Sequence, residues 1–309
     1  MQSPQVNVEI DLARVRGNVQ AISKQTGVDV IAVVKADGYG LGAKRIAGAI
    51  ADLVGGFCVF RLEEAQSAGL WEMAHKPILA LGPSVGIDVD EFVNAHVRPA
   101  VWTVEESRRL RRARPVLCVD TGMKRFACPP EHIEEVIAAG EIDEAFTHAI
   151  RVEHARLLAS LVGGRRLRLH AAASGLLDEP AARFDAVRPG MAIYRGAARV
   201  ATRLVETRDG DGPAGYTGFT AGRFGVILCG YSNGLRKGPC LVNGQRRSVL
   251  EVGMQSAFVE LGPRDQSGDE VVLLGESLSE AEIAHAWGTS EQQAMQSLVN
   301  AGRRTYRGG

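Results

Sequence analysis

Residues 30–42 of this 309-residue chain read VIAVVKADGYGLG: five apolar residues lead to Lys35, and a turn with three glycines follows at once. A short apolar run that ends in turn residues is typical of a buried parallel strand. A lysine at the end of such a strand can lose its proton by desolvation and attack an aldehyde. On spacing alone, a solvated lysine at a strand-loop junction is the better interpretation. A functional role for Lys35 therefore needs support from other parts of the sequence.

Composition excludes several classes of protein. The chain has 36 basic and 36 acidic side chains, and 45% of its residues are hydrophobic. It is expected to form one large domain and one smaller domain. Without a basic excess we expect no nucleic-acid partner, and the arginine-rich stretch 108–114 is interpreted as a solvated helix face.

Cysteine spacing and hydropathy indicate a cytoplasmic protein. The five cysteines form no C-x-x-C pair, so neither a metal site nor a disulfide framework is expected. Reduced thiols fit the cytoplasm. Residues 1–8 are polar and lack the apolar core of a signal peptide, and no stretch reaches the length of a membrane span. We therefore expect no membrane partner.

Apolar runs alternate with helical patterns on both sides of Lys35. The strand candidates are residues 28–36, 57–60, 77–81, 98–102, 115–120, 145–150, 167–172 and 186–194. Helical patterns cover residues 63–71, 104–112, 132–139 and 152–162, and another follows the helix-capping residue Asp11. This order predicts an α/β fold, an N-terminal (β/α)8 TIM-like barrel, whose chemistry collects at the C-terminal ends of the strands. The candidate residues at or just after such ends are Lys35, Asp120, His148, Ser174 and Gly190.

The pattern changes after about residue 200. Helices give way to short runs at residues 224–228, 248–252, 257–261 and 270–274, with turn signals at Asn233-Gly234 and Asn243-Gly244. We predict a barrel domain over residues 1–200 and a β-rich C-terminal domain over residues 201–309. We also expect residues 6–10 to pair with the C-terminal domain and the tail 303–309 to be frayed.

Residues 33–42, VVKADGYGLG, resemble the lysine motif of the alanine racemases, fold-type III enzymes that depend on pyridoxal 5'-phosphate. The resemblance implies that Lys35 forms the internal aldimine and that Tyr39 bonds the cofactor phosphate. It runs from about residue 6 to residue 306, in a chain shorter than typical members.

Two further segments resemble family motifs near the cofactor. FTH at residues 146–148 implies that His148 bonds the catalytic tyrosine within the cofactor site. LHAAAS at residues 169–174 resembles H-x-A-N-S, which implies that Ser174 bonds the phosphate. A satisfied core histidine and a turn serine are the structural alternatives.

Residues 187–194, VRPGMAIY, are similar to the family's R-P-G-I-x-L-Y-G. The resemblance implies that Arg188 donates to the pyridine nitrogen and that the backbone N–H groups of Gly190 and Met191 bond the phosphate. An always-charged guanidinium keeps the pyridine unprotonated and makes the ring a poorer electron sink. Clean proton exchange at Cα is the expected outcome.

The substrate side resembles the family at three places. Residues 119–125, VDTGMKR, imply that Arg125 holds the substrate carboxylate, a group that its planar fork binds in a bidentate manner. VGMQS implies a substrate-side Met254, and GYSNG implies that Tyr231 lines the entrance.

Residues 215–221, GYTGFTA, resemble the segment that carries the second catalytic base. Tyr216 is the candidate, and in the family this tyrosine reaches the active site of the partner subunit. The resemblance therefore implies a homodimer with shared active sites. A half-buried strand tyrosine is the alternative interpretation.

Four positions depart from the family pattern. The thiol of Cys118 replaces a lysine that is often carbamylated, and a neutral thiol supplies no negative charge. Ala173 and Gln255 replace an asparagine and an aspartate, and Gln292 stands near the place of a phosphate-binding tyrosine.

Three functions follow from these observations. The first is a racemase, an isomerase that interconverts L- and D-alanine, with Lys35 and Tyr216 as the two bases. The second is a racemase for a basic or larger amino acid, which Cys118 and the shortened segments suggest. The third is a non-catalytic cofactor-binding or homeostasis protein of the same barrel fold, although its small barrel-only members lack a C-terminal domain. Arg188 argues against a decarboxylase.

Overall fold

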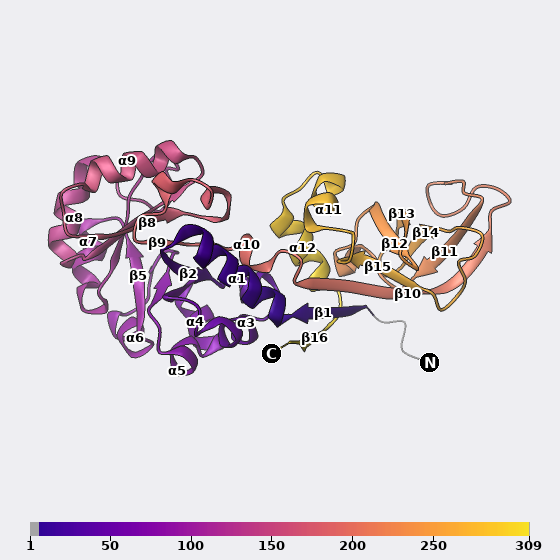
Figure 1. Ribbon diagram of the computed structural model, residues 1–309, viewed down its shortest axis with the longest axis horizontal. Helices are drawn as coiled ribbons and strands as arrows, with labels where there is room; N and C mark the ends of the chain where they lie inside the picture. The colour runs from indigo at the N-terminus through magenta and orange to yellow at the C-terminus, as the bar shows by residue number, and fades with distance from the viewer. Residues whose placement is uncertain (1–5, 309) are drawn as a thin grey trace. The chain divides into compact units, whose positions relative to one another are not determined.

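The computed structural model describes residues 6–308 of the chain (Figure 1). Two compact units account for them. The barrel unit comprises Val15–Gly38 and Gly42–Ile193. The sheet unit comprises the described residues up to Arg14, then Tyr39–Leu41, and the described residues from Tyr194 onward.

Eight parallel strands close the barrel unit in sequence order, and helices surround them (Figure 1). The strands are β2 (Asp29–Val33), β3 (Gly56–Val59), β4 (Ile78–Ala80), β5 (Val97–Val101), β6 (Val116–Cys118), β7 (Glu144–Ala149), β8 (Arg168–Ala172) and β9 (Ala186–Val187). The helices are α1 (Leu12–Thr26), α2 (Lys35–Tyr39), α3 (Ala43–Ile50), α4 (Leu62–Ala68), α5 (Leu70–Ala74), α6 (Val89–Asn94), α7 (Val104–Arg109), α8 (Ile133–Gly140), α9 (Val152–Val162) and α10 (Met191–Tyr194). Each strand candidate of this region overlaps a barrel strand, so the predicted barrel is confirmed.

Helix α1 shows how the sequence sets these elements. The carboxylate of Asp11 accepts a hydrogen bond from the backbone N–H of Arg14 at 2.9 Å, which caps the helix as predicted. The side chains that recur every three or four residues along α1, namely Leu12, Val15, Val19 and Ile22, are all buried. Their burial keeps one face of the helix on the core.

One long sheet dominates the sheet unit, in the order β11-β14-β13-β12-β15-β10-β1-β16. Its strands are β1 (Asn7–Asp11), β10 (Ala198–Asp209), β11 (Arg223–Ile227), β12 (Gly238–Val242), β13 (Gln245–Val252), β14 (Ala257–Glu260), β15 (Glu270–Leu274) and β16 (Arg303–Arg307). Two helices, α11 (Glu280–Trp287) and α12 (Glu291–Val299), complete the unit. The predicted Asn243-Gly244 turn joins β12 to β13 with positive φ angles of 49° and 73°, as a type I′ hairpin requires.

Three sequence expectations were wrong. The tail is not frayed, because β16 pairs in parallel with β1 and the Tyr306 hydroxyl donates to the Leu41 carbonyl at 3.0 Å. The candidate strand 186–194 ends at Val187, because Pro189 and Gly190 interrupt it and helix α10 follows. Helices α11 and α12 were not predicted, although Ser279 and Ser290 cap them.

Within the described residues, no helix combines the length and the apolar character needed to cross a membrane.

Candidate active site

Lys35 follows the buried end of β2 and begins a turn of left-handed backbone. Ala36, Asp37, Gly38 and Tyr39 have φ angles of 52°, 54°, 62° and 59°. This conformation costs roughly 1–2 kcal/mol for each residue with a Cβ atom, so the surroundings have to hold it. The side chain of Asp37 accepts from the Ala43 N–H at 2.9 Å, and its carbonyl accepts from the Gly42 N–H at 2.8 Å. The strained turn is thus tied to the start of α3.

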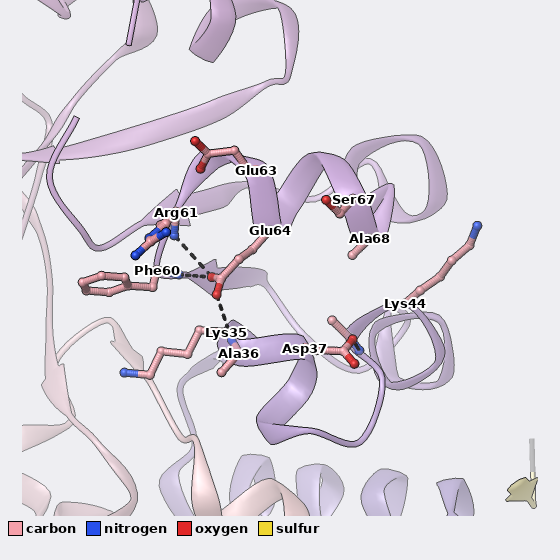
Figure 2. Close-up of a pocket in the computed structure, with 11 residues that line it drawn as sticks. Lys35, Ala36, Asp37, Lys44, Phe60, Arg61, Glu63, Glu64, Ser67 and Ala68 are labelled. Atoms are coloured by element: carbon pink, nitrogen blue, oxygen red, sulfur yellow. Dashed lines mark hydrogen bonds between the residues drawn. The ribbon is translucent and has the colours of Figure 1, made fainter. Parts of the chain in front are cut away.

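The carboxylate of Glu64, on α4, secures the other side of this turn (Figure 2). It accepts hydrogen bonds from the backbone N–H groups of Ala36 at 3.0 Å, Phe60 at 2.6 Å and Arg61 at 3.3 Å. A cavity of about 740 Å³ lies between these segments, and Lys35 is part of its lining. In Figure 2 the Lys35 side chain extends in the direction of the Phe60 ring, whereas Lys44 lies at the far end of the cavity.

Burial and positive neighbours act together on Lys35. Desolvation of the half-buried amine lowers its pKa, and the charges of Arg125 and Arg188 lower it further. The same pair of arginines acts on His148, at the end of β7. Partial desolvation, then Arg188 and Lys35, lower the pKa of His148 to about 4, so its ring is neutral at physiological pH. The structure therefore brings Lys35, Arg125, His148 and Arg188 to one end of the barrel.

Arg188 lies inside the barrel and is only 4% exposed. One of its terminal nitrogens donates to the Thr147 carbonyl at 2.5 Å, and the guanidinium lies 4.5 Å from the centre of the Phe146 ring. Burial lowers the pKa of Arg188. Its Nε is buried and has no hydrogen-bond partner among residues 6–308. A buried donor without a partner suits a ligand that brings an acceptor atom, such as an unprotonated pyridine nitrogen.

A second polar site lies where the Ser174 hydroxyl meets the backbone N–H groups at the start of α10. The Ser174 hydroxyl accepts from the backbone N–H groups of Gly190 at 3.0 Å and Ala192 at 3.1 Å. Met191, between them, is buried. Backbone N–H groups and a hydroxyl at the start of a helix suit an anion such as phosphate. Sequence reasoning identified Ser174, Gly190 and Met191 here but missed Ala192.

Tyr39 belongs to the sheet unit and contacts a residue that sequence reasoning missed. Its ring centre lies 4.9 Å from that of Tyr194. Tyr194 is fully buried, and burial raises its pKa well above the usual value. Tyr194 ends the VRPGMAIY segment and matches the tyrosine of R-P-G-I-x-L-Y-G, so this similarity could have identified it as a site residue.

Arg125 lies on the loop after β6. The carboxylate of Asp120 accepts from the N–H groups of Gly122 at 2.8 Å and Lys124 at 3.1 Å, which shapes this loop. Arg125 itself is exposed. Burial raises the pKa of Cys118 to about 12, so this thiol is neutral and offers no negative charge at the family's lysine position.

The other three candidates lie in the sheet unit and form what we call the exposed cluster: Tyr216, Tyr231 and Met254. Their exposed fractions are 92%, 58% and 60%. The Tyr231 N–H donates to the Gly253 carbonyl at 2.9 Å, which places it beside the Met254 segment. A methyl group added at Gly253 would lie 3.9 Å from Cε2 of Tyr216. Large apolar side chains gathered on an open surface are typical of an interaction site.

Comparisons with known proteins agree with this arrangement. Residues 10–198 match the family model for the alanine racemase N-terminal domain, and residues 214–306 match the model for the C-terminal domain. The alanine racemase of Vibrio cholerae is 30% identical over 361 aligned positions that cover 97% of each chain. Those positions outnumber the 309 residues here, so this chain carries deletions relative to it.

Solved structures show the same fold. The alanine racemase of Streptomyces coelicolor A3(2) superposes with a TM-score of 0.87 at 26% identity, covering 98% of both chains. That of Bartonella henselae, described as having covalently bound pyridoxal phosphate, superposes with a TM-score of 0.85 at 20% identity, covering 98% of this chain and 99% of that one. With both domain models matched in order along the chain, the protein belongs to the alanine racemase family.

Proposed function

We propose that this protein is a pyridoxal-phosphate-dependent isomerase that interconverts L- and D-alanine, with Lys35 and Tyr216 as its two bases. The observation that carries the proposal is Lys35 itself. It follows a barrel strand, and burial together with Arg125 and Arg188 lowers its pKa. An amine whose pKa is lowered loses its proton more readily than a solvated lysine, and the free amine is the form that acts as a nucleophile and base.

The residues of the barrel fit the cofactor. Lys35 would hold its aldehyde carbon, the unpartnered Nε of Arg188 would face its ring nitrogen, and Ser174 with the N–H groups of Gly190 and Met191 would hold its phosphate. We further propose that Tyr39 bonds the phosphate and that His148 completes the site. When bound, the cofactor makes the α-proton of an amino acid more acidic by drawing electron density from Cα.

Three side chains of the protein then have separate roles in the reaction. Arg125 binds the substrate carboxylate through its planar fork and fixes which bond at Cα faces each base. Nζ of Lys35 takes or returns the α-proton on one face, and the hydroxyl of Tyr216 does so on the opposite face. The neutral ring of His148 adds no positive charge beside them.

We propose that Tyr216 acts in the active site of a second copy of the chain, in a homodimer with shared active sites. The support is the exposed cluster, in which three large side chains lie on the surface of the sheet unit, as is typical of an interaction site. We also propose a cytoplasmic location, since all five cysteines are free. We propose that residues 1–200 form the cofactor-binding domain, except for strand β1, which pairs with β10.

A racemase for a basic or larger amino acid is the second candidate. The observation in its favour is the neutral thiol of Cys118, which leaves Arg125 without the family's negatively charged partner. The non-catalytic candidate is less well supported, because residues 214–306 match the C-terminal domain model of the racemases.

Absorbance and chiral analysis test the proposal together. The purified protein is expected to show a cofactor band that is lost in Lys35→Ala, and to convert L-alanine into a racemic mixture. A band without D-alanine would favour the non-catalytic candidate, and faster α-proton exchange with lysine or arginine than with alanine would favour the second. Absence of any band would overturn the cofactor assignment.

A further inference from the structure

Tyr216 stands on a short closed loop of the sheet unit. The Ala214 N–H donates to the Phe219 carbonyl at 2.8 Å, which closes the loop at its base. The Phe219 ring then packs against Phe224 and Phe258, with ring centres 5.4 Å and 5.2 Å apart. The base of the loop is therefore fixed to the sheet, whereas the Tyr216 side chain is 92% exposed and gains little from packing of its own.

A single carboxylate holds the tip of this loop. Glu251, near the end of β13, is only 3% exposed. Its Oε1 accepts from the Tyr216 N–H at 2.8 Å, and its Oε2 accepts from the Thr217 N–H at 2.7 Å and from the Thr217 hydroxyl. These bonds lower the pKa of Glu251, so it stays ionised at neutral pH. Hydrogen bonds to an ionised acceptor are roughly twice as strong as neutral ones.

The backbone before the tyrosine is adapted to the same carboxylate. Gly215 has a φ of 69°, a conformation that side chains rarely adopt. A Cβ atom there would lie 2.5 Å from Oε1 of Glu251, so only glycine allows the carboxylate to approach. Glu251 itself is not a member of the exposed cluster.

We infer that Glu251 is a positioning residue for proton transfer at Tyr216: it fixes the backbone of the tyrosine and so the place of its hydroxyl. The inference rests on the proposed function. A residue that positions Tyr216 affects the two enantiomers of alanine differently, whereas a residue that only supports the fold affects both equally. The two bases act on opposite faces of Cα, so the first proton removed from one enantiomer goes to Tyr216 and that from the other goes to Lys35. Loss of Glu251 has to slow only the enantiomer that depends on Tyr216.

The experiment measures α-proton exchange of L- and D-alanine in deuterated water by the holoenzyme. Tyr216→Phe first identifies the enantiomer that depends on the tyrosine. Glu251→Ala is expected to slow exchange of that same enantiomer about 10- to 100-fold, because misplacing a reacting group by about 1 Å costs on this order. Exchange of the other enantiomer stays within about twofold. Glu251→Gln keeps one acceptor oxygen, so its exchange rate for that enantiomer is expected to lie between those of wild type and Glu251→Ala. Glu260→Ala removes an exposed glutamate of the neighbouring β14 as the matched control.

The double variant and an activity-independent readout complete the test. In the Tyr216→Phe background, Glu251→Ala is expected to have no further effect, since the group that it positions is gone. Backbone amide exchange by mass spectrometry is expected to show the amides of positions 216 and 217 protected in wild type and in Tyr216→Phe, and unprotected in Glu251→Ala.

Each outcome decides the inference. Equal slowing of both enantiomers, or a full further loss in the Tyr216→Phe background, would show that Glu251 only supports the fold. Wild-type behaviour of Glu251→Ala would overturn the inference and leave the proposed function intact. Failure of the wild-type holoenzyme to exchange either enantiomer would overturn the proposed function and the inference with it.

Discussion

The Glu64 carboxylate accepts a hydrogen bond from the backbone N–H of Ala36, the residue that follows Lys35, at a distance of 3.0 Å. Helix α4 therefore determines where the left-handed turn begins. Because Glu64 also binds the N–H groups of Phe60 and Arg61, its loss leaves three donors without their acceptor.

Glu64→Ala is expected to lower the free energy of unfolding by about 1–3 kcal/mol, the usual cost of leaving hydrogen-bonding groups unsatisfied. It is also expected to lower kcat for alanine more than it raises KM, because it displaces Lys35 rather than Arg125, the residue proposed to bind the substrate carboxylate. Urea denaturation and steady-state kinetics measure both effects. Glu63→Ala removes the exposed neighbour on the same helix, and an equal effect of that variant would refute the role of Glu64.

Arg188→Gln is expected to raise the pKa of His148 from about 4 toward its ordinary value, because the arginine charge is a main cause of the lowered value after desolvation. A titration followed by NMR checks this. An unchanged pKa of His148 would mean that the charge of Arg188 does not lower it.

Acid is expected to destabilise the barrel through His170. This ring is fully buried, its Nε2 donates to Glu144 at 2.9 Å, and burial lowers its pKa to about 4. The unfolded chain binds this proton near pH 6.5 and the folded chain does not, so stability is full above about pH 6.5 and falls as the pH drops toward 4. Between pH 7 and pH 5 the loss is about 2 kcal/mol.

Urea denaturation of wild type and His170→Gln at both pH values tests this expectation. The variant lacks the titrating ring, so its unfolding free energy should change less between pH 7 and pH 5. The same pH dependence in both proteins would assign the acid sensitivity to other groups.

If the exposed cluster forms the interface of the proposed dimer, Met254→Asp is expected to shift the protein to monomer, because it places a charge in that interface. Sedimentation velocity at several concentrations measures the shift. Val85→Asp changes a side chain of the barrel unit that is 81% exposed, and it should leave association unchanged. A dimer that tolerates Met254→Asp would place the interface elsewhere.

The barrel could be predicted because its signals are local. Each strand is a short apolar run beside turn residues, as at residues 30–34, and the strands pair in sequence order. Strand β16 was missed for the opposite reason. Its sequence RRTYR has little apolar character, and it is a strand because it pairs with β1, which lies at the other end of the chain.

The candidate site divides in the same way. Lys35 and Arg188 could be named from contiguous motifs, and the structure places both at one end of the barrel. Glu251 could not, because it lies 35 positions after Tyr216 in the sequence, and the two come together only through the pairing of β11 with β14 and of β14 with β13. Nothing near Glu251 in the sequence signals that its carboxylate serves a distant loop.

Reduction of the purified holoenzyme with borohydride, followed by peptide mass spectrometry, tests the central claim most directly. A cofactor-sized mass increase on the peptide that contains Lys35, and its loss in Lys35→Ala but not in Lys44→Ala, is the predicted result. A modified lysine elsewhere in the chain, or no modified lysine at all, would contradict the assignment of Lys35 as the residue that holds the cofactor.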